Sequence, residues 1–331
     1  MAQYRTRTFK LTLGKPVYIG SAATNIASYI NMGGENNAYY VSNETGAANI
    51  EFEVKKDNSK EPNKGYITLY NLSEDTVNYL DANQRESLAV VLEAGYDGDN
   101  QILFSGTIEF VQDKWDGPTR QTKMILGDAT QNLMTAKTSR SYRKGTSLDT
   151  VLNDLISDLK LPSGKIVKFG AETTQQAMAF SGNAATNLAK LAKNTGSTFS
   201  VQDGAVYWTK QGKRLKQTVF EISVESGMHD SPTAQNPEPA KRRLEKKAKS
   251  KKKTTKPHEK TAAEIKEDAG LVVVTALNGA ILPESTIYLK SLKYTGFYKV
   301  VYLTHKGELE GSNWTTELGL SETRGGVVEE G

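Results

Sequence analysis

The sequence predicts a mainly β protein with a small α/β domain, in which two β-barrel domains flank a helix-containing middle domain. Runs of β-branched and aromatic residues, bounded by Gly, Asn and Pro, occupy both ends of the chain, and such runs are typical of strands. Between them, apolar residues repeat at the spacing of an amphipathic helix. At 331 residues, the chain is long enough for two or three domains with cores of their own.

Residues 1–130 predict the first β barrel, with one short helix. Ser73 is a good N-cap for that helix, and Val77 and Leu80 give it an apolar face. A polar, Gly- and Asn-rich insertion at 14–49 is either an arm that contacts a partner or a surface loop. Strands are expected at 9–13, 50–55, 65–70, 87–94, 101–104, 106–113 and 122–127.

Residues 131–210 predict a small α/β domain. A first helix starts near Ser147, and a second covers about 183–194. Asp203-Gly204 between two short apolar runs is a strong hairpin signal. The apolar stripe of the first helix is interpreted as core and consists of Leu148, Val151, Leu152, Leu155, Ile156 and Leu159.

Residues 211–321 predict a second β barrel, which opens with a strand at 219–224 and is interrupted by a basic insertion at 228–268. Residues 322–331 are expected to be a flexible tail. The later strands of this barrel are expected at 271–277, 286–289, 297–305 and 314–320.

The basic insertion carries the chain's positive charge. Residues 241–260 hold eleven Lys and Arg against two Glu, a net charge of +9, so the rest of the chain carries −5 of the total of +4. The tract either contacts a polyanion, such as DNA phosphates or an acidic protein face, or is a solvated insertion that keeps an assembly soluble. The candidate contact residues are Lys241, Arg242, Arg243, Lys246, Lys247, Lys249, Lys251, Lys252 and Lys253.

The sequence predicts no catalytic, cofactor-binding or metal-binding residues, and hence no enzyme. The chain has no Cys and three His, which share no close spacing. His305 lies in an expected strand, where a lone His is more often a surface or edge residue than a catalytic base. No apolar signal core or membrane-spanning run is present, so the protein is expected to be made and used in a cytoplasm.

Two sets of motifs resemble the baseplate hub proteins of contractile-tailed bacteriophages. The first set lies in the first barrel and comprises Gly65–Ser73 (GYITLYNLS), Val90–Tyr96 (VVLEAGY) and Leu103–Gly106 (LFSG). The hairpin Asp203–Trp208 (DGAVYW) also fits the family. The second set resembles the family's last barrel and comprises Ala276–Asn278, Gly296–Val300, Thr304–Gly307 and Asn313–Leu318. The order and spacing of these short motifs carry the resemblance.

The resemblance implies a structural role without cofactors. Hub proteins of this kind are homotrimers with two tube-like barrels per subunit. Three chains therefore form a ring that acts as a symmetry adaptor between the sixfold tail tube and the threefold central spike, around the genome channel. The implied partners are the tail-tube protein, the spike and other baseplate proteins, with transient contact to phage DNA.

The implied location is the virion tail baseplate, after assembly in the host bacterial cytoplasm. Related type VI secretion spike proteins continue beyond the second barrel, so the spike is expected to be a separate chain here. Two alternatives stay open: a tail-associated cell-wall hydrolase, and a tail-tube initiator protein.

Overall fold

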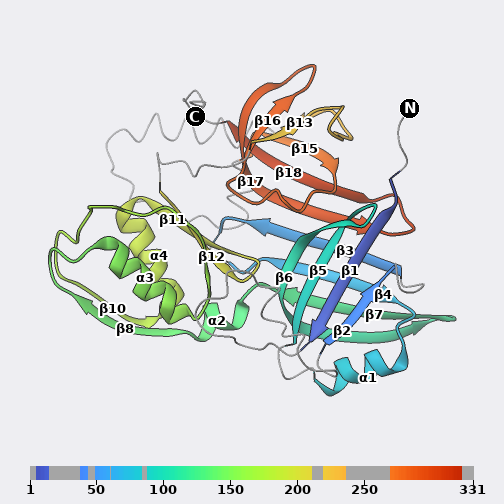
Figure 1. Cartoon of the computed structure of the whole chain (residues 1–331), viewed down its shortest axis with the longest axis horizontal. Helices are drawn as coiled ribbons and strands as arrows, with labels where there is room; N and C mark the ends of the chain where they lie inside the picture. Colours follow the sequence, from blue (N-terminus) through green and yellow to red (C-terminus); the bar gives the residue numbers. More distant parts are fainter. Residues whose placement is uncertain are drawn as a thin grey trace.

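The computed structural model describes residues 5–14, 38–43, 49–59, 61–83, 88–210, 219–235 and 269–322. The fold is mainly β with a small helical part, as the sequence predicts. Figure 1 shows three groups of elements: one of β strands with a single helix, one that holds most of the helices, and one of β strands from the C-terminal part of the chain. Each group surrounds a hydrophobic core of its own.

The first module is an antiparallel sheet whose strands follow the order β3-β4-β7-β6-β5-β1-β2. Alternation of apolar and polar residues puts every second side chain of β3 in the core, with Ile50, Phe52 and Val54 buried. The elements of this module are β1 (Arg7–Gly14), β2 (Ala38–Ser42), β3 (Asn49–Asp57), β4 (Lys64–Tyr70), α1 (Glu74–Ala82), β5 (Ala89–Tyr96), β6 (Asp99–Asp116) and β7 (Thr119–Gly127).

Two details of the first module differ from the sequence expectation. Residues 101–113 form part of one continuous strand, β6, rather than two strands, because Ser105 and Gly106 stay paired with β5. Within the expected insertion 14–49, Ala38–Ser42 is a strand that pairs with β1. Residues 15–37 and 44–48 of that insertion lie outside the described residues.

The middle module packs two helices against short strands. The predicted stripe of α3 is buried, and α4 ends at Gly196, which has a left-handed φ of 63°. The hairpin at Asp203-Gly204 forms as predicted. The elements are α2 (Thr130–Thr135), β8 (Lys137–Tyr142), α3 (Leu148–Leu159), β9 (Ser163–Ile166), β10 (Met178–Asn183), α4 (Ala184–Thr195), β11 (Ser197–Gln202) and β12 (Ala205–Lys210).

The second module continues the large sheet with the strand order β14-β15-β18-β17, while β16 pairs with β17 and β13 pairs with β16. Residues 228–235, which the sequence analysis assigns to the basic insertion, run along β15 instead. Residues 236–268 and the expected tail 323–331 lie outside the described residues. The elements are β13 (Phe220–Ile222), β14 (Thr233–Ala234), β15 (Leu271–Ala276), β16 (Thr286–Lys290), β17 (Thr295–Glu308) and β18 (Trp314–Glu322).

Candidate functional site: the strand joint between the two β modules

One strand pairing joins the two β modules into a single sheet. The second half of β17 pairs antiparallel with β3, from Tyr302 opposite Asp57 to Glu308 opposite Glu51. The first half of β17 is paired with β16, and this pairing extends along β17 only as far as Lys299. β17 therefore extends past its own module and adds a strand to its neighbour, and we call the β3–β17 pairing the joint.

An aromatic anchor closes one end of the joint. Trp314 is buried, and its indole N–H donates to the carbonyl oxygen of Gly95 at 3.0 Å. The Phe52 and Trp314 rings meet edge to face, with centroids 5.3 Å apart. Gly307 has no side chain where the Phe52 ring lies, and a Cβ there would come within 2.2 Å of that ring. A glycine at this position therefore permits the close approach of β3.

His305 lies in the middle of the joint and is fully buried, so the expectation of a surface or edge residue is wrong. The pattern misleads because β17 has a strand on both sides at this point, with Val54 opposite on β3 and Thr316 opposite on β18. Its Nδ1 and the Thr316 hydroxyl share a hydrogen bond of 2.9 Å. Burial, and then the charge of Lys56, hold the pKa of His305 well below its usual 6.5.

A buried ion pair holds the other end of the joint to the middle module. Lys56 is fully buried, and its Nζ donates to both carboxylate oxygens of Asp203, at 2.7 and 2.6 Å. Asp203 belongs to the β11–β12 turn, and its carboxylate also accepts from the backbone N–H of Ser105 on β6. One carboxylate of the middle module thus contacts two strands of the first module.

A second carboxylate completes this network. Asp128, at the end of β7, accepts from the backbone N–H groups of Asp203 and Gly204 at 2.8 and 2.6 Å, and from the Asn63 amide at 3.1 Å. Burial, and then the nearby charge of Asp203, raise the pKa of Asp128 to about 7. Each module thus supplies a charge or a hydrogen-bond donor to a group that the other module would otherwise bury without a partner.

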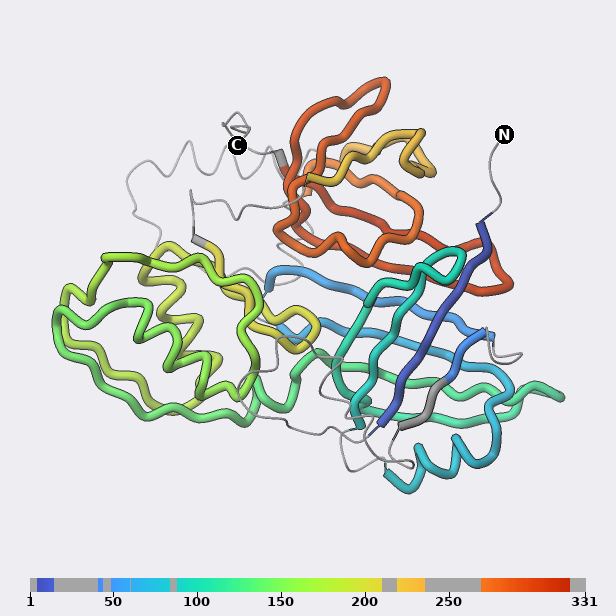
Figure 2. Tube along the Cα trace, viewed as in Figure 1, coloured from blue at the N-terminus to red at the C-terminus, as the bar shows by residue number. Residues whose placement is uncertain are grey.

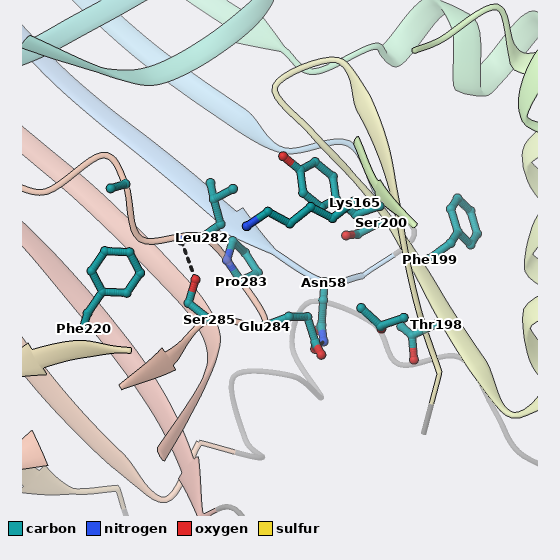
Figure 3. Close-up of a pocket in the computed structure, with 13 residues that line it drawn as sticks. Asn58, Lys165, Thr198, Phe199, Ser200, Phe220, Leu282, Pro283, Glu284 and Ser285 are labelled. Atoms are coloured by element: carbon teal, nitrogen blue, oxygen red, sulfur yellow. Dashed lines mark hydrogen bonds between the residues drawn. The ribbon is translucent and has the colours of Figure 1, made fainter. Parts of the chain in front are cut away.

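A cavity of about 250 Å³ lies where the three modules meet. Figure 3 shows its walls: Lys165 and Ser200 from the middle module, Asn58 from the loop after β3, and Glu284 and Ser285 from the second module. Three of its polar residues, Asn58, Glu284 and Ser285, are engaged in contacts within the protein. The Glu284 carboxylate is bonded to Asn58 and Lys299, and the hydroxyl of Ser285 accepts from the N–H of Leu282 at 3.1 Å. These contacts hold the walls of the cavity together.

The two β modules repeat one arrangement of strands. In the first, β3, β4, β7, β6 and β5 are neighbours in that order; in the second, β14, β15, β18, β17 and β16 are. Helix α1 connects β4 to β5, and a loop takes its place between β15 and β16. The correspondence ends at the outermost strand, since β1 pairs antiparallel with β5 whereas β13 pairs parallel with β16.

The arrangement is similar to that of solved phage tail proteins. No protein-family model and no curated protein matches the chain by sequence. The 43 kDa tail protein of prophage MuSo2 from Shewanella oneidensis superposes with a TM-score of 0.52 at 8% identity, over 83% of this chain and 98% of that one. A tail protein from Neisseria meningitidis MC58 gives 0.51 at 10% identity, over 83% and 96%.

The chain has the fold of phage tail proteins. A component of the Escherichia coli type VI secretion system, described as structurally similar to the T4 tail proteins gp27 and gp5, also matches, with a TM-score of 0.52 at 8% identity over 83% of this chain and 73% of that one. These neighbours are consistent with the resemblance to tail hub proteins that the sequence motifs indicate.

The residues that form the joint are not the candidate contact residues that the sequence suggests. All nine basic residues at 241–253 lie outside the described residues. Within the described ranges, no three His, Asp or Glu side chains gather in a way that could hold a metal ion, and no helix is both long and apolar enough to cross a membrane. The sequence did hold a signal for Lys56: strict alternation from Ile50 puts it on the buried face.

Proposed function

We propose that the chain is a structural tail hub protein, which forms a trimeric ring that joins the sixfold tail tube to the threefold central spike. The observation that carries the proposal is the pair of equivalent β modules in one sheet. Three chains with two equivalent modules each supply six similar units, which suits a neighbour of sixfold symmetry on one side and a threefold one on the other. The fold of phage tail proteins supports the same role.

The joint contributes stiffness to this role. The buried Lys56–Asp203 pair and the buried Trp314 each bind elements far apart in the sequence. The Trp314 contact and the β3–β17 pairing hold the two β modules to each other, and the Lys56–Asp203 pair holds the first of them to the middle module. Three chains that are each held together in this way would be preorganised for closure of a ring. Partners in this proposal are the tube protein, the spike and other baseplate proteins, and the location is the virion baseplate.

Two alternatives give different outcomes in one experiment. In the phage that encodes the chain, deletion of its gene should leave particles without assembled tails, and a labelled chain should restore tails with the label at the tail tip, seen by electron microscopy. Complete tails that fail only to digest cell wall would favour a hydrolase. Label at the origin of each tube in the absence of a threefold ring would favour a tube initiator.

Contact of the basic tract with a polyanion stays a prediction. Counterion release makes such binding fall steeply with salt. If the tract contacts DNA, deletion of residues 240–256 should reduce both the affinity for duplex DNA and its dependence on salt concentration. Absence of DNA binding by the intact protein at low salt would leave the solvated insertion as the interpretation.

A further inference from the structure

We propose that neighbouring chains of the ring are joined by pairing the free half of β6 in one chain with β14 of a second copy, in the same register that β17 and β3 use within one chain. The inference rests on the proposed trimer and names the surfaces that would form it. It follows from a residue-by-residue match between the two modules.

The match between β6 and β17 is fixed by two features that coincide. Each strand has a register shift in its pairing with the next strand, between Ile108 and Phe110 in β6 and between Val300 and Tyr302 in β17. Pairing with the preceding strand extends along β6 as far as Thr107, and along β17 as far as Lys299. Both features give the same alignment, in which Lys114 of β6 corresponds to Lys306 of β17.

The match between β14 and β3 follows from their partners. β14 pairs antiparallel with β15 as β3 pairs with β4, and Ala234 opposite Leu271 corresponds to Val54 opposite Gly65. Thr233 therefore corresponds to Glu53. Because Glu53 lies opposite Lys306 in the joint, the equivalent pair between chains is Thr233 of one copy and Lys114 of the next.

Both surfaces are open edges among the described residues. Beyond Thr107, β6 is paired with β7 on one side, and no described strand pairs with its other side. β14 is the last strand of the sheet order. Open edges expose backbone donors and acceptors that pair readily with another chain. Figure 2 shows the β6–β7 turn projecting past the rest of the first module, where a second chain can reach it.

The occupant is identified by the joint inside the chain. That joint proves that the outer edge of a β3-type strand accepts the second half of a β6-type strand. In the joint between copies, Gln112–Trp115 would lie antiparallel to Pro232–Gln235. The two edges differ from one another, so each copy offers one of each, and such head-to-tail contacts close into a ring if the rotation permits.

The side chains are complementary at the end of this register. In the joint within the chain, Phe52 of β3 covers Gly307 of β17. In the proposed joint between copies, the corresponding positions are Trp115 on β6 and Pro232 beside β14. The large side chain there belongs to the β6-type strand instead of the β3-type strand. Trp115 is 65% exposed, so its ring can pack against the second copy beside Pro232, which is itself buried within its own chain. Pro232 has no N–H to donate, which places it at the end of the pairing.

Disulfide trapping tests the register directly, because the chain has no Cys. The N–H of Leu309 donates to the Ile50 carbonyl, so Glu53 and Lys306 form a non-hydrogen-bonded pair, with Cα atoms about 4.5 Å apart, close enough for a disulfide. Oxidation of Lys114→Cys/Thr233→Cys should give a covalent closed trimer that reductant reverses. The matched control, Glu53→Cys/Lys306→Cys, should close within one chain and stay monomeric on a denaturing gel.

The outcomes separate this inference from the proposed function. A trimer by mass in solution whose Lys114→Cys/Thr233→Cys form gives no cross-link, while the control pair closes, contradicts the joint between copies and leaves the hub proposal intact. A protein that is monomeric by mass and gives no cross-link contradicts both. An open ladder of ever longer covalent chains supports the pairing and contradicts a ring of three. Both substituted positions are exposed, and thermal unfolding checks that the variants fold.

Discussion

Lys55 and Lys56 are neighbours in β3 with opposite surroundings. Lys56 is fully buried on Asp203, whereas the Lys55 side chain is 59% exposed and pairs with Glu53. Alternation along a strand is enough to cause the difference, since successive side chains point to opposite faces. The same residue type thus has a structural role at one position and almost none at the next.

Replacement of Lys56 should therefore cost much more than replacement of Lys55. Lys56→Met keeps the length of the side chain but leaves the carboxylates of Asp203 and Asp128 together without a cation, so we expect the free energy of unfolding to fall by about 3–5 kcal/mol. Lys55→Met should cost less than about 1 kcal/mol. Urea denaturation measures both. Adding Asp203→Asn to Lys56→Met should restore part of the loss, and equal effects of the two single variants would contradict the network.

His305 gives a pH dependence whose sign follows from its burial. Because its pKa in the folded protein lies well below 6.5, the unfolded chain binds the proton first as the pH falls. The contribution of His305 to stability is therefore complete above the unfolded pKa and is lost as the pH falls below about 6.5. Relative to His305→Gln, the wild type should lose stability between pH 7.5 and pH 5. A constant difference between the two proteins over that range would rule out this account.

At the scale of elements, most strands and both long helices were predictable because their signals are local. The α3 stripe, the Ser73 cap and the Asp203-Gly204 turn all depend on residues within a few positions of one another. The start of α3 was less predictable. Ser147 makes no side-chain cap hydrogen bond, and Asp149 in the first turn accepts from the N–H groups of Phe169 and Gly170, at 2.7 and 3.1 Å. That choice depends on a loop twenty residues away.

The joint is the element-scale feature that sequence could not predict. Strand pairing between β3 and β17 brings together residues about 250 positions apart, and no local propensity selects one distant edge over another. Its one local trace is Gly307 within a run of β-forming residues, which is typical of a close backbone approach. Alternation along β3 already places Lys56 on the buried face, whereas the burial of His305 becomes intelligible only when that pairing is known.

Gly307→Ala should separate the two strands of the joint. The added Cβ would collide with the Phe52 ring, and overpacking of this kind costs about 1–3 kcal/mol. Gly270→Ala is the matched control, since the nearest atom to its added Cβ is 4.0 Å away, and it should cost less than about 0.5 kcal/mol. Hydrogen exchange should quicken at β3 and the second half of β17 in Gly307→Ala alone. Unchanged exchange there would show that the joint tolerates the methyl group.

At the scale of the whole molecule, the joint makes the two β modules one continuous sheet, which would act as a single unit of the proposed ring. The same strand positions that pair within the chain remain open at its two ends, on β6 and β14. In the proposed ring, each chain would supply one half of each joint with its neighbours. The fold of phage tail proteins and the repeated β module thus support the same proposed role.

Trp115 should matter to the assembly and little to the fold. It is 65% exposed, and aromatic anchors dominate many interfaces. Trp115→Ala should weaken trimer formation by about tenfold or more, as measured by dilution in analytical ultracentrifugation, with an unchanged melting temperature. Leu292→Ala, which removes another exposed apolar side chain at the loop before β17, serves as the control and should leave the trimer unaffected. Equal weakening by both variants would count against the proposed contact.

The mass of the intact protein in solution tests the central claim most directly. The account predicts a closed trimer, with three times the 36.3 kDa mass of one chain, by native mass spectrometry or light scattering, and threefold rings of six similar lobes in electron micrographs. A protein that remains monomeric at micromolar concentration, or that forms rings of another number of chains, would contradict it.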